Sequence, residues 1–273
     1  NINAISLFNH EAHLFSHIYG GDHNLTEIEV LLQAKNNSHF NFEKVGEKSS
    51  NLSDEQFINF VKKGKEHCFR GDVFQLVLSR CFSQGFKGDE FNVYRTLRSI
   101  NPSPYLFFFD YGYFKIFGSS PEAQLIVQSG KAEIHPIAGT FRRTGDDEKD
   151  AVAAGLLAKD PKENSEHVML VDLARNDLSR NGSQVVVEKN REIQFYSHVI
   201  HLVSKVSCTM KKATKTFRVV ADTFPAGTLS GAPKHRALQL IDQYETTKRN
   251  VYGGAIGYMD FHGNFNHAII IRS

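Results

Sequence analysis

One stretch, Lys162-Glu-Asn-Ser-Glu-His-Val-Met-Leu-Val-Asp-Leu-Ala-Arg-Asn-Asp177, combines an apolar centre with charged ends. Pro161 comes just before it, and proline fits the first turn of a helix, where its missing N–H is not needed. The stretch is therefore predicted to be a helix, on which Glu163 and Glu166 share one face because they stand three residues apart. Two carboxylates placed in this way can hold a hard cation such as Mg2+, which prefers oxygen ligands. A solvated charged face beside a core helix is the alternative.

The composition excludes several classes of protein. The 273 residues are 41% hydrophobic and 23% charged, as in an ordinary globular protein, and the net charge of +2 gives no basic field for nucleic acid. No apolar run reaches the length of about 18 residues that a membrane span needs, and the N-terminus lacks the pattern of a signal peptide. Cys68, Cys81 and Cys208 are scattered, without metal-ligand spacing or a disulfide framework. A reducing, cytoplasmic location is expected.

Local patterns predict an α+β fold. Ser53-Asp-Glu-Gln56 is a capping box that opens a helix ending before Gly71. The run Val73–Arg80 is β-branched and aromatic and is predicted to be a buried strand. Turn residues at 110–112 and 129–130 separate strand-like segments and predict two hairpins. Hairpins grouped between helices predict antiparallel sheets covered on one face by helices.

The domain organisation is predicted to be simple. No linker rich in Pro, Gly or Ser divides the chain, so residues 1–273 are expected to form a single domain. The first 50 residues show only weak patterns. Because the chain begins with Asn1 instead of methionine, it is expected to be part of a longer protein, truncated at both ends.

Two loops offer backbone N–H groups next to a hydroxyl. They are His135-Pro-Ile-Ala-Gly-Thr140 and Phe224-Pro-Ala-Gly-Thr-Leu-Ser-Gly-Ala-Pro-Lys234. The second loop opens a predicted helix, whose N-terminus suits a carboxylate. Tight turns explain the glycines equally well, and neither loop has the phosphate-binding Gly-Lys-Ser/Thr pattern.

Three single residues have both a structural and a functional interpretation. His201 lies in an alternating strand, where a histidine is usually a core residue. Arg272 ends the last strand and is either a surface residue or a two-pronged clamp for a carboxylate. Glu122 follows Ser119-Ser-Pro121 and is either a loop charge or a proton donor. The residues alone thus support an α+β protein with a candidate Mg2+ and carboxylate site.

Nine segments also match known motifs, in the same order along residues 53–273. They are Gly71–Arg80, Asn101–Tyr105, Gly118–Glu122, Pro136–Thr140, Lys162–Asp177, His201–Ser204, Gly227–Lys234, Tyr252–Tyr258 and Ile269–Arg272. With these motifs the chain resembles the chorismate-utilising enzymes, most closely the large subunits (component I) of anthranilate synthases. The family fold is a two-sheet antiparallel β-sandwich flanked by helices.

The resemblance implies that chorismate and ammonia are converted to anthranilate and pyruvate, with Mg2+ as cofactor. The implied partner is a glutamine amidotransferase subunit (component II) that supplies ammonia. Four groups of residues are implied: catalytic Glu122, His201 and Thr228; substrate-binding Gly139, Thr140, Tyr252 and Arg272; metal-binding Glu163 and Glu166; and, for inhibition by tryptophan, Asn101, Pro102, Ser103, Pro104 and Tyr105.

Two positions separate the relatives within this family. Isochorismate and salicylate synthases usually carry a lysine where this chain has Gln75, and aminodeoxychorismate synthases commonly carry one where it has Ala138. The resemblance therefore favours anthranilate synthase over aminodeoxychorismate synthase. It also implies a continuation beyond Ser273, with a glycine loop and a second Mg2+ glutamate. Without that continuation, a non-catalytic fragment is the third interpretation.

Overall fold

The computed structural model describes all residues except 1, 9–10, 18–24, 35–40 and 197. It divides into two compact units, Asn1–Asn41 and Phe42–Ser273. In the first unit, β1 (Ile2–Phe8) pairs antiparallel with β2 (Glu11–His17), and α1 covers Leu25–Gln33. A single domain over residues 1–273 stays a prediction.

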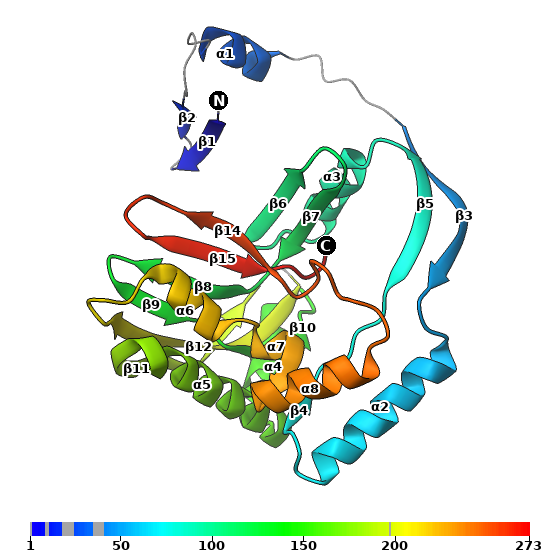
Figure 1. Ribbon diagram of the computed structural model, residues 1–273, viewed down its shortest axis with the longest axis vertical. Coiled ribbons are helices and arrows are strands. Elements are labelled where there is room, and N and C mark those ends of the chain that lie inside the picture. Colours follow the sequence, from blue (N-terminus) through cyan, green and yellow to red (C-terminus); the bar gives the residue numbers. More distant parts are fainter. Residues whose placement is uncertain (1, 9–10, 18–24, 35–40, 197) are drawn as a thin grey trace. The chain divides into compact units, whose positions relative to one another are not determined.

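The second unit is built on a seven-stranded antiparallel sheet (Figure 1). Its strand order is β10-β12-β9-β8-β15-β14, and β11 pairs with β12. The strands are β8 (Ala123–Gln128), β9 (Lys131–Ile134), β10 (Ile137–Arg142), β11 (Gly182–Phe195), β12 (Val199–Met210), β14 (Ala255–Met259) and β15 (Phe265–Ile269). Three antiparallel pairs complete the described strands of this unit: β3 (Phe42–Ser50) with β5 (Phe82–Gly88), β4 (Gln75–Leu76) with β13 (Gly231–Ala232), and β6 (Tyr105–Asp110) with β7 (Lys115–Ser120).

The helices of this unit are α2 (Asp54–Phe69), α3 (Phe91–Ile100), α4 (Asp147–Lys159), α5 (Pro161–Asn181), α6 (Thr216–Thr223), α7 (Gly227–Ser230) and α8 (Lys234–Tyr244). The α+β class with antiparallel sheets and helices is confirmed. The predicted capping box at Ser53 is present, and so is the predicted helix over residues 162–177. Asp160 caps the N-terminus of α5, because its side chain accepts a hydrogen bond from the Glu163 backbone N–H.

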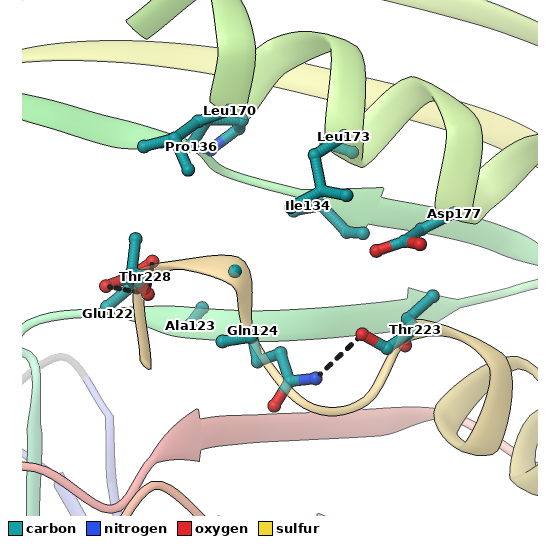
Figure 2. Close-up of a pocket in the computed structure, with 13 residues that line it drawn as sticks. Glu122, Ala123, Gln124, Ile134, Pro136, Leu170, Leu173, Asp177, Thr223 and Thr228 are labelled. Atoms are coloured by element: carbon teal, nitrogen blue, oxygen red, sulfur yellow. Dashed lines mark hydrogen bonds between the residues drawn. The ribbon is translucent and has the colours of Figure 1, made fainter. Parts of the chain in front are cut away.

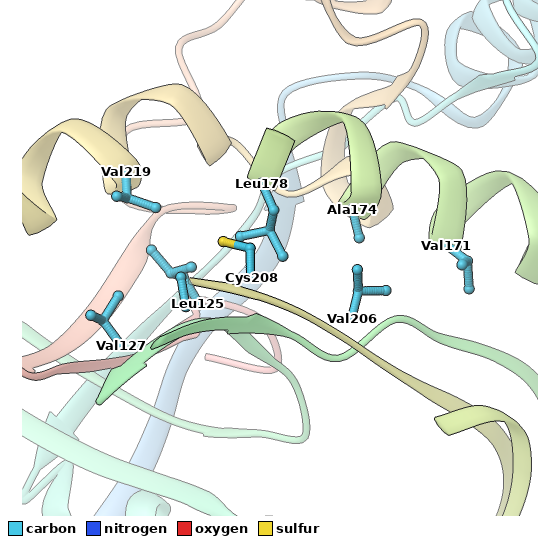
Figure 3. Close-up of a cluster of buried hydrophobic side chains, with 9 residues drawn as sticks. Leu125, Val127, Val171, Ala174, Leu178, Val206, Cys208 and Val219 are labelled. Atoms are coloured by element: carbon cyan, nitrogen blue, oxygen red, sulfur yellow. The ribbon is translucent and has the colours of Figure 1, made fainter. Parts of the chain in front are cut away.

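The main core lies between α5, α6 and one face of the large sheet (Figure 3). Leu178 of α5 and Leu125 of β8 are fully buried there, together with Val206 of β12. A second cluster joins α4 to Ile200 and Leu202 on the same face of β12. Burying one such side chain contributes about 1.5–3 kcal/mol. These contacts hold α4, and α5 from Val171 onward, on the sheet.

The buried strand predicted over Val73–Arg80 is wrong. Only Gln75–Leu76 form a strand, and the side chain of Phe74 is 79% exposed. The segment runs along the short β13 and the end of α7, where Phe74 N–H donates to Ala232 O and Val77 N–H donates to Ser230 O. An apolar, β-branched run is expected in a long strand, but this partner is too short to extend the pairing. Among the described helices, none combines the length and hydropathy needed to cross a bilayer.

Candidate active site

Glu122 stands just before β8 and is held from two sides. Its backbone carbonyl accepts from the Ile269 N–H, and its carboxylate accepts from Thr228 Oγ1 at 3.2 and 3.4 Å. Burial raises the pKa of Glu122 to about 7, although the Thr228 hydroxyl and the positive charge of Arg272 both lower it. Near neutral pH this carboxyl is therefore divided between its protonated and ionised forms, as a proton donor requires.

His201 is fixed against a bulge of the neighbouring strand. The β10–β12 register shifts between Ala138 and Thr140, so the intervening Gly139 is left out of the ladder at φ +71°. His201 Nδ1 lies 2.8 Å from Gly139 O and 3.2 Å from Thr140 Oγ1. Burial lowers the pKa of His201, and Arg272 lowers it further. In the neutral ring the bond to a carbonyl places the proton on Nδ1 and leaves Nε2 as the acceptor.

Arg272 influences both Glu122 and His201 through its positive charge. It follows β15 at φ +53°, is exposed, and its charge acts on the pKa of both Glu122 and His201. Tyr252 lies in the loop before β14, where the adjoining Gly253 N–H donates to Ile270 O at 2.9 Å. The Tyr252 ring also packs against the guanidinium of Arg249. The exposed guanidinium of such an arginine can bind an anionic ligand through two hydrogen bonds.

The two glutamates of α5 have different neighbours. A Cβ built on Gly139 would lie 3.5 Å from Glu163 Cβ and 3.4 Å from Glu163 Oε2, so Glu163 faces the bulge. Glu166 Oε1 instead accepts from Gln75 Nε2 at 3.1 Å. Among the described residues, the exposed Lys162 is the one charged side chain that pairs with either carboxylate, 3.6 Å from Glu163 Oε1.

These residues fit part of a Mg2+ site. Gln75 Oε1 is buried and has no hydrogen-bond partner among the described residues, so a second hard oxygen lies beside Glu166. Mg2+ is usually held by one or two carboxylates, with substrate oxygens and waters completing its shell. Within the described residues, no group of three or more His, Cys, Asp or Glu side chains could hold a metal by itself.

The predicted tryptophan segment lies at the start of the β6–β7 hairpin. The Asn101 carbonyl accepts from Ser119 Oγ, and Tyr105 pairs with Ser120. Ser119 and Ser120 are fully buried and lead directly to Pro121 and Glu122. The segment is thus connected to the strand that carries the acid, and its inhibitor-binding role stays a prediction.

Two of the cavities beside α5 are lined by candidate site residues. The smaller, of about 40 Å³, lies between α5, β8 and α7 and is lined by Glu122, Gln124, Asp177 and Thr228 among others (Figure 2). It has room for about two or three waters. The larger, of about 730 Å³, is lined by Gln75 and Glu166. Thr228 thus contacts Glu122, and His201 contacts the Gly139 bulge that Glu163 faces, while Glu166 lines the larger cavity.

The sequence prediction missed several polar contacts around this site. Lys234 Nζ bonds to Asp177 Oδ2 at 2.7 Å and to Thr223 O at 2.8 Å, and Gln124 Nε2 donates to the same carbonyl. His167 Nε2 lies 2.6 Å from Ser204 Oγ. Asp177, Lys234, His167 and Ser204 all fall inside the quoted motifs, but nothing in the sequence says which residues pair across such distances.

Comparison with known proteins defines the class. The family model described as chorismate binding enzyme matches residues 6–273, further toward the N-terminus than the motifs reach. The chain belongs to the family of chorismate binding enzymes.

Particular relatives are more specific. The chain is 46% identical over 226 residues to anthranilate synthase component 1 of Aquifex aeolicus, covering 82% of this chain and 46% of the relative. It is 45% identical over 248 residues to the protein of that name from Bacillus subtilis, covering 90% and 47%. The crystal structure of anthranilate synthase component I from Streptococcus pneumoniae superposes with a TM-score of 0.78 at 37% identity, covering 91% of this chain and 56% of that one.

A more distant structure shares the fold alone. MenF, the menaquinone-specific isochorismate synthase of Escherichia coli, has a TM-score of 0.79 at 19% identity and covers 90% of this chain and 58% of its own. The chain spans about half the length of the curated relatives that it matches.

Proposed function

We propose that this chain is the chorismate-binding catalytic part of an anthranilate synthase component I. It would convert chorismate and ammonia to anthranilate, pyruvate and water. The observation that carries the proposal is the 41–46% identity to relatives named anthranilate synthase component 1, which extends over 82–92% of this chain.

Two side chains support ammonia as the nucleophile. Ala138 is buried on β10 opposite Leu202, and its methyl group cannot attack a substrate. Gln75 is not a base, and its amide N–H is already donated to Glu166. Neither position provides an amine that could attack the ring or activate water, so the nucleophile must come from solution or from a partner.

The buried acid and the neutral imidazole divide the proton transfers. Glu122 is partly protonated near neutral pH, and its proton would go to the C4 hydroxyl, which leaves as water when ammonia adds at C2. Thr228 holds the Glu122 carboxyl in place for this transfer. His201 Nε2 would then assist the elimination that releases pyruvate and leaves the aromatic ring. Arg272 would bind the enolpyruvyl carboxylate, with Tyr252 beside it, and Gly139 and Thr140 would line the ring.

Glu163 and Glu166 would hold Mg2+, with Gln75 Oε1 beside Glu166. When bound, Mg2+ neutralises the ring carboxylate of chorismate and orients it. A glutamine amidotransferase subunit (component II) would supply ammonia. Tryptophan would inhibit through Asn101–Tyr105, and activity that stays constant as tryptophan is added would contradict that part of the proposal.

The test is a product assay on the full-length protein with chorismate, Mg2+ and ammonium. Anthranilate fluorescence that rises together with an equal amount of pyruvate is the expected result. A 4-amino product without pyruvate would instead identify an aminodeoxychorismate synthase. Bound chorismate without any product would indicate a non-catalytic fragment.

A further inference from the structure

One buried oxygen, Ser204 Oγ, joins three elements around the candidate metal site. It lies 2.6 Å from His167 Nε2 on α5 and accepts from the Arg191 N–H of β11 at 2.9 Å. Ser204 and His167 are both fully buried. The Ser204 backbone N–H also donates to Pro136 O, at the start of the segment that leads into the Gly139 bulge. A single residue of β12 thus contacts both parts of the site.

Arg191 adds a second connection to the same helix. It lies in an irregular part of β11, where the register shifts between Lys189 and Glu192, and its φ is +56°. A residue other than glycine costs roughly 1–2 kcal/mol in this conformation, so the surrounding contacts must hold it. Its guanidinium Nη1 donates to Asn164 Oδ1 on the first turn of α5 at 3.3 Å.

These contacts fall beside the two glutamates in sequence. Asn164 follows Glu163, and His167 follows Glu166. The main apolar core contacts α5 only from Val171 onward. The first two turns therefore depend on polar contacts for their position. His167 Nδ1 has no partner among the described residues, although leaving a buried polar atom unpaired is costly. If this position served packing alone, an apolar side chain would avoid that cost. The hydrogen bond to Ser204 therefore explains why a histidine stands at position 167.

We propose that Ser204, His167, Arg191 and Asn164 form a brace that positions Glu163 and Glu166 on the first two turns of α5, with Glu163 against the Gly139 bulge, so that the two carboxylates bind a divalent cation. The inference rests on the proposed function for the metal site. The four are positioning residues, because none of them would touch the substrate. Partners that orient metal ligands in this way typically change metal affinity by about 10–100-fold when they are removed.

The test measures binding of Mn2+, as a probe for Mg2+, to the full-length protein by electron paramagnetic resonance, without substrate. Ser204→Ala is expected to raise the Mn2+ dissociation constant about tenfold. The matched control is Ser207→Ala. Ser207 is also on β12 and buried, but it bonds to Glu188 on the opposite face of the sheet. The control should lose stability and keep its Mn2+ affinity within about twofold. Equal effects in the two variants would overturn the brace.

A second variant covers the case in which Ser204→Ala does not fold. Arg191→Ala removes only an exposed guanidinium and should weaken Mn2+ binding about tenfold; unchanged binding would overturn the proposal. If the protein forms anthranilate and neither substitution changes its Mn2+ affinity, the brace is contradicted and the proposed function stands. A protein that forms no anthranilate but loses Mn2+ affinity as expected supports the brace and rejects the reaction. If the unaltered protein binds no Mn2+, the brace is overturned.

Discussion

The two ends of α5 are held in place by different forces. From Val171 to Leu178 the helix is buried by apolar contacts with β8 and β12. From Glu163 to His167 it is held by hydrogen bonds to Ser204, Arg191 and Gln75. Apolar contacts tolerate rearrangement, whereas a buried polar contact has one geometry and is costly to leave unmade. Changes at the apolar end should therefore lower stability, and changes at the polar end should lower activity.

The largest effect is expected at the polar end. Glu166→Gln should abolish Mg2+-dependent turnover, by about a thousandfold or more, because a bound metal contributes several kcal/mol of charge stabilisation. Melting temperature and the rate of anthranilate formation would both be measured. Asp172→Asn is the control, since Asp172 is an exposed acid on the same helix. Undiminished turnover in Glu166→Gln would remove Glu166 from the metal site.

The apolar end should respond in the opposite way. Leu178→Ala leaves a cavity in the main core and should lower the free energy of unfolding by about 2–5 kcal/mol. Denaturant unfolding gives this value, and the activity of the remaining folded protein should stay within about threefold of the original. Lost activity in a variant that is still fully folded would mean that the two ends are not independent.

The buried acid should make stability depend on pH. The pKa of Glu122 is raised from 4.5 to about 7, so the folded state binds the proton more tightly than the unfolded state. The resulting contribution is fully present below about pH 4.5 and is lost as the pH rises to about 7, by roughly 2–3 kcal/mol.

In Glu122→Gln this loss should disappear, so unfolding measured between pH 5 and 7 should have a flatter pH dependence than in the original protein. The same proton is needed for catalysis, so turnover of the original protein should fall above about pH 7. Identical pH dependence in the two proteins would show that the Glu122 carboxyl is not shielded from water.

The smallest effect is expected where the bulge meets the helix. In Gly139→Ala the new Cβ would lie 2.8 Å from Leu157 Cδ1 and would press on Glu163, at φ +71°. We expect a loss of about 1–3 kcal/mol in stability and weaker Mg2+ binding. Gly145→Ala is the matched control, because Gly145 has φ +83° with no atom within 4 Å of the new Cβ. If both variants bind Mg2+ equally well, contact between the bulge and Glu163 does not set the metal site.

The sequence predicted the parts of the fold that local physics determines. The capping box at Ser53, the helix begun by Pro161 and the hairpin around Asp110–Gly112 follow from neighbouring residues and are all present. The strand predicted over Val73–Arg80 is wrong because the local pattern favours a strand, whereas the length of the strand that forms depends on its two-residue partner β13.

The motifs name candidate residues for the site but not the contacts between them, and the roles of these residues stay predictions. The motifs named Glu122, Thr228 and His201, and the structure adds that Glu122 bonds to Thr228 across 106 positions of sequence. The bulge at Gly139 and the pairing of His167 with Ser204 arise from the register of β10, β11 and β12. No single segment encodes that register, so these contacts could not be derived from any one motif.

The most direct test of the proposed reaction uses 15N-labelled ammonium with chorismate and Mg2+, followed by nuclear magnetic resonance of the product. The proposal predicts that the label enters the ring carbon next to the one bearing the carboxylate, with one pyruvate released for each labelled ring. A label on the carbon opposite the carboxylate, or a labelled product formed without pyruvate, would contradict the assignment of ammonia to C2 and of Glu122 to the departing hydroxyl.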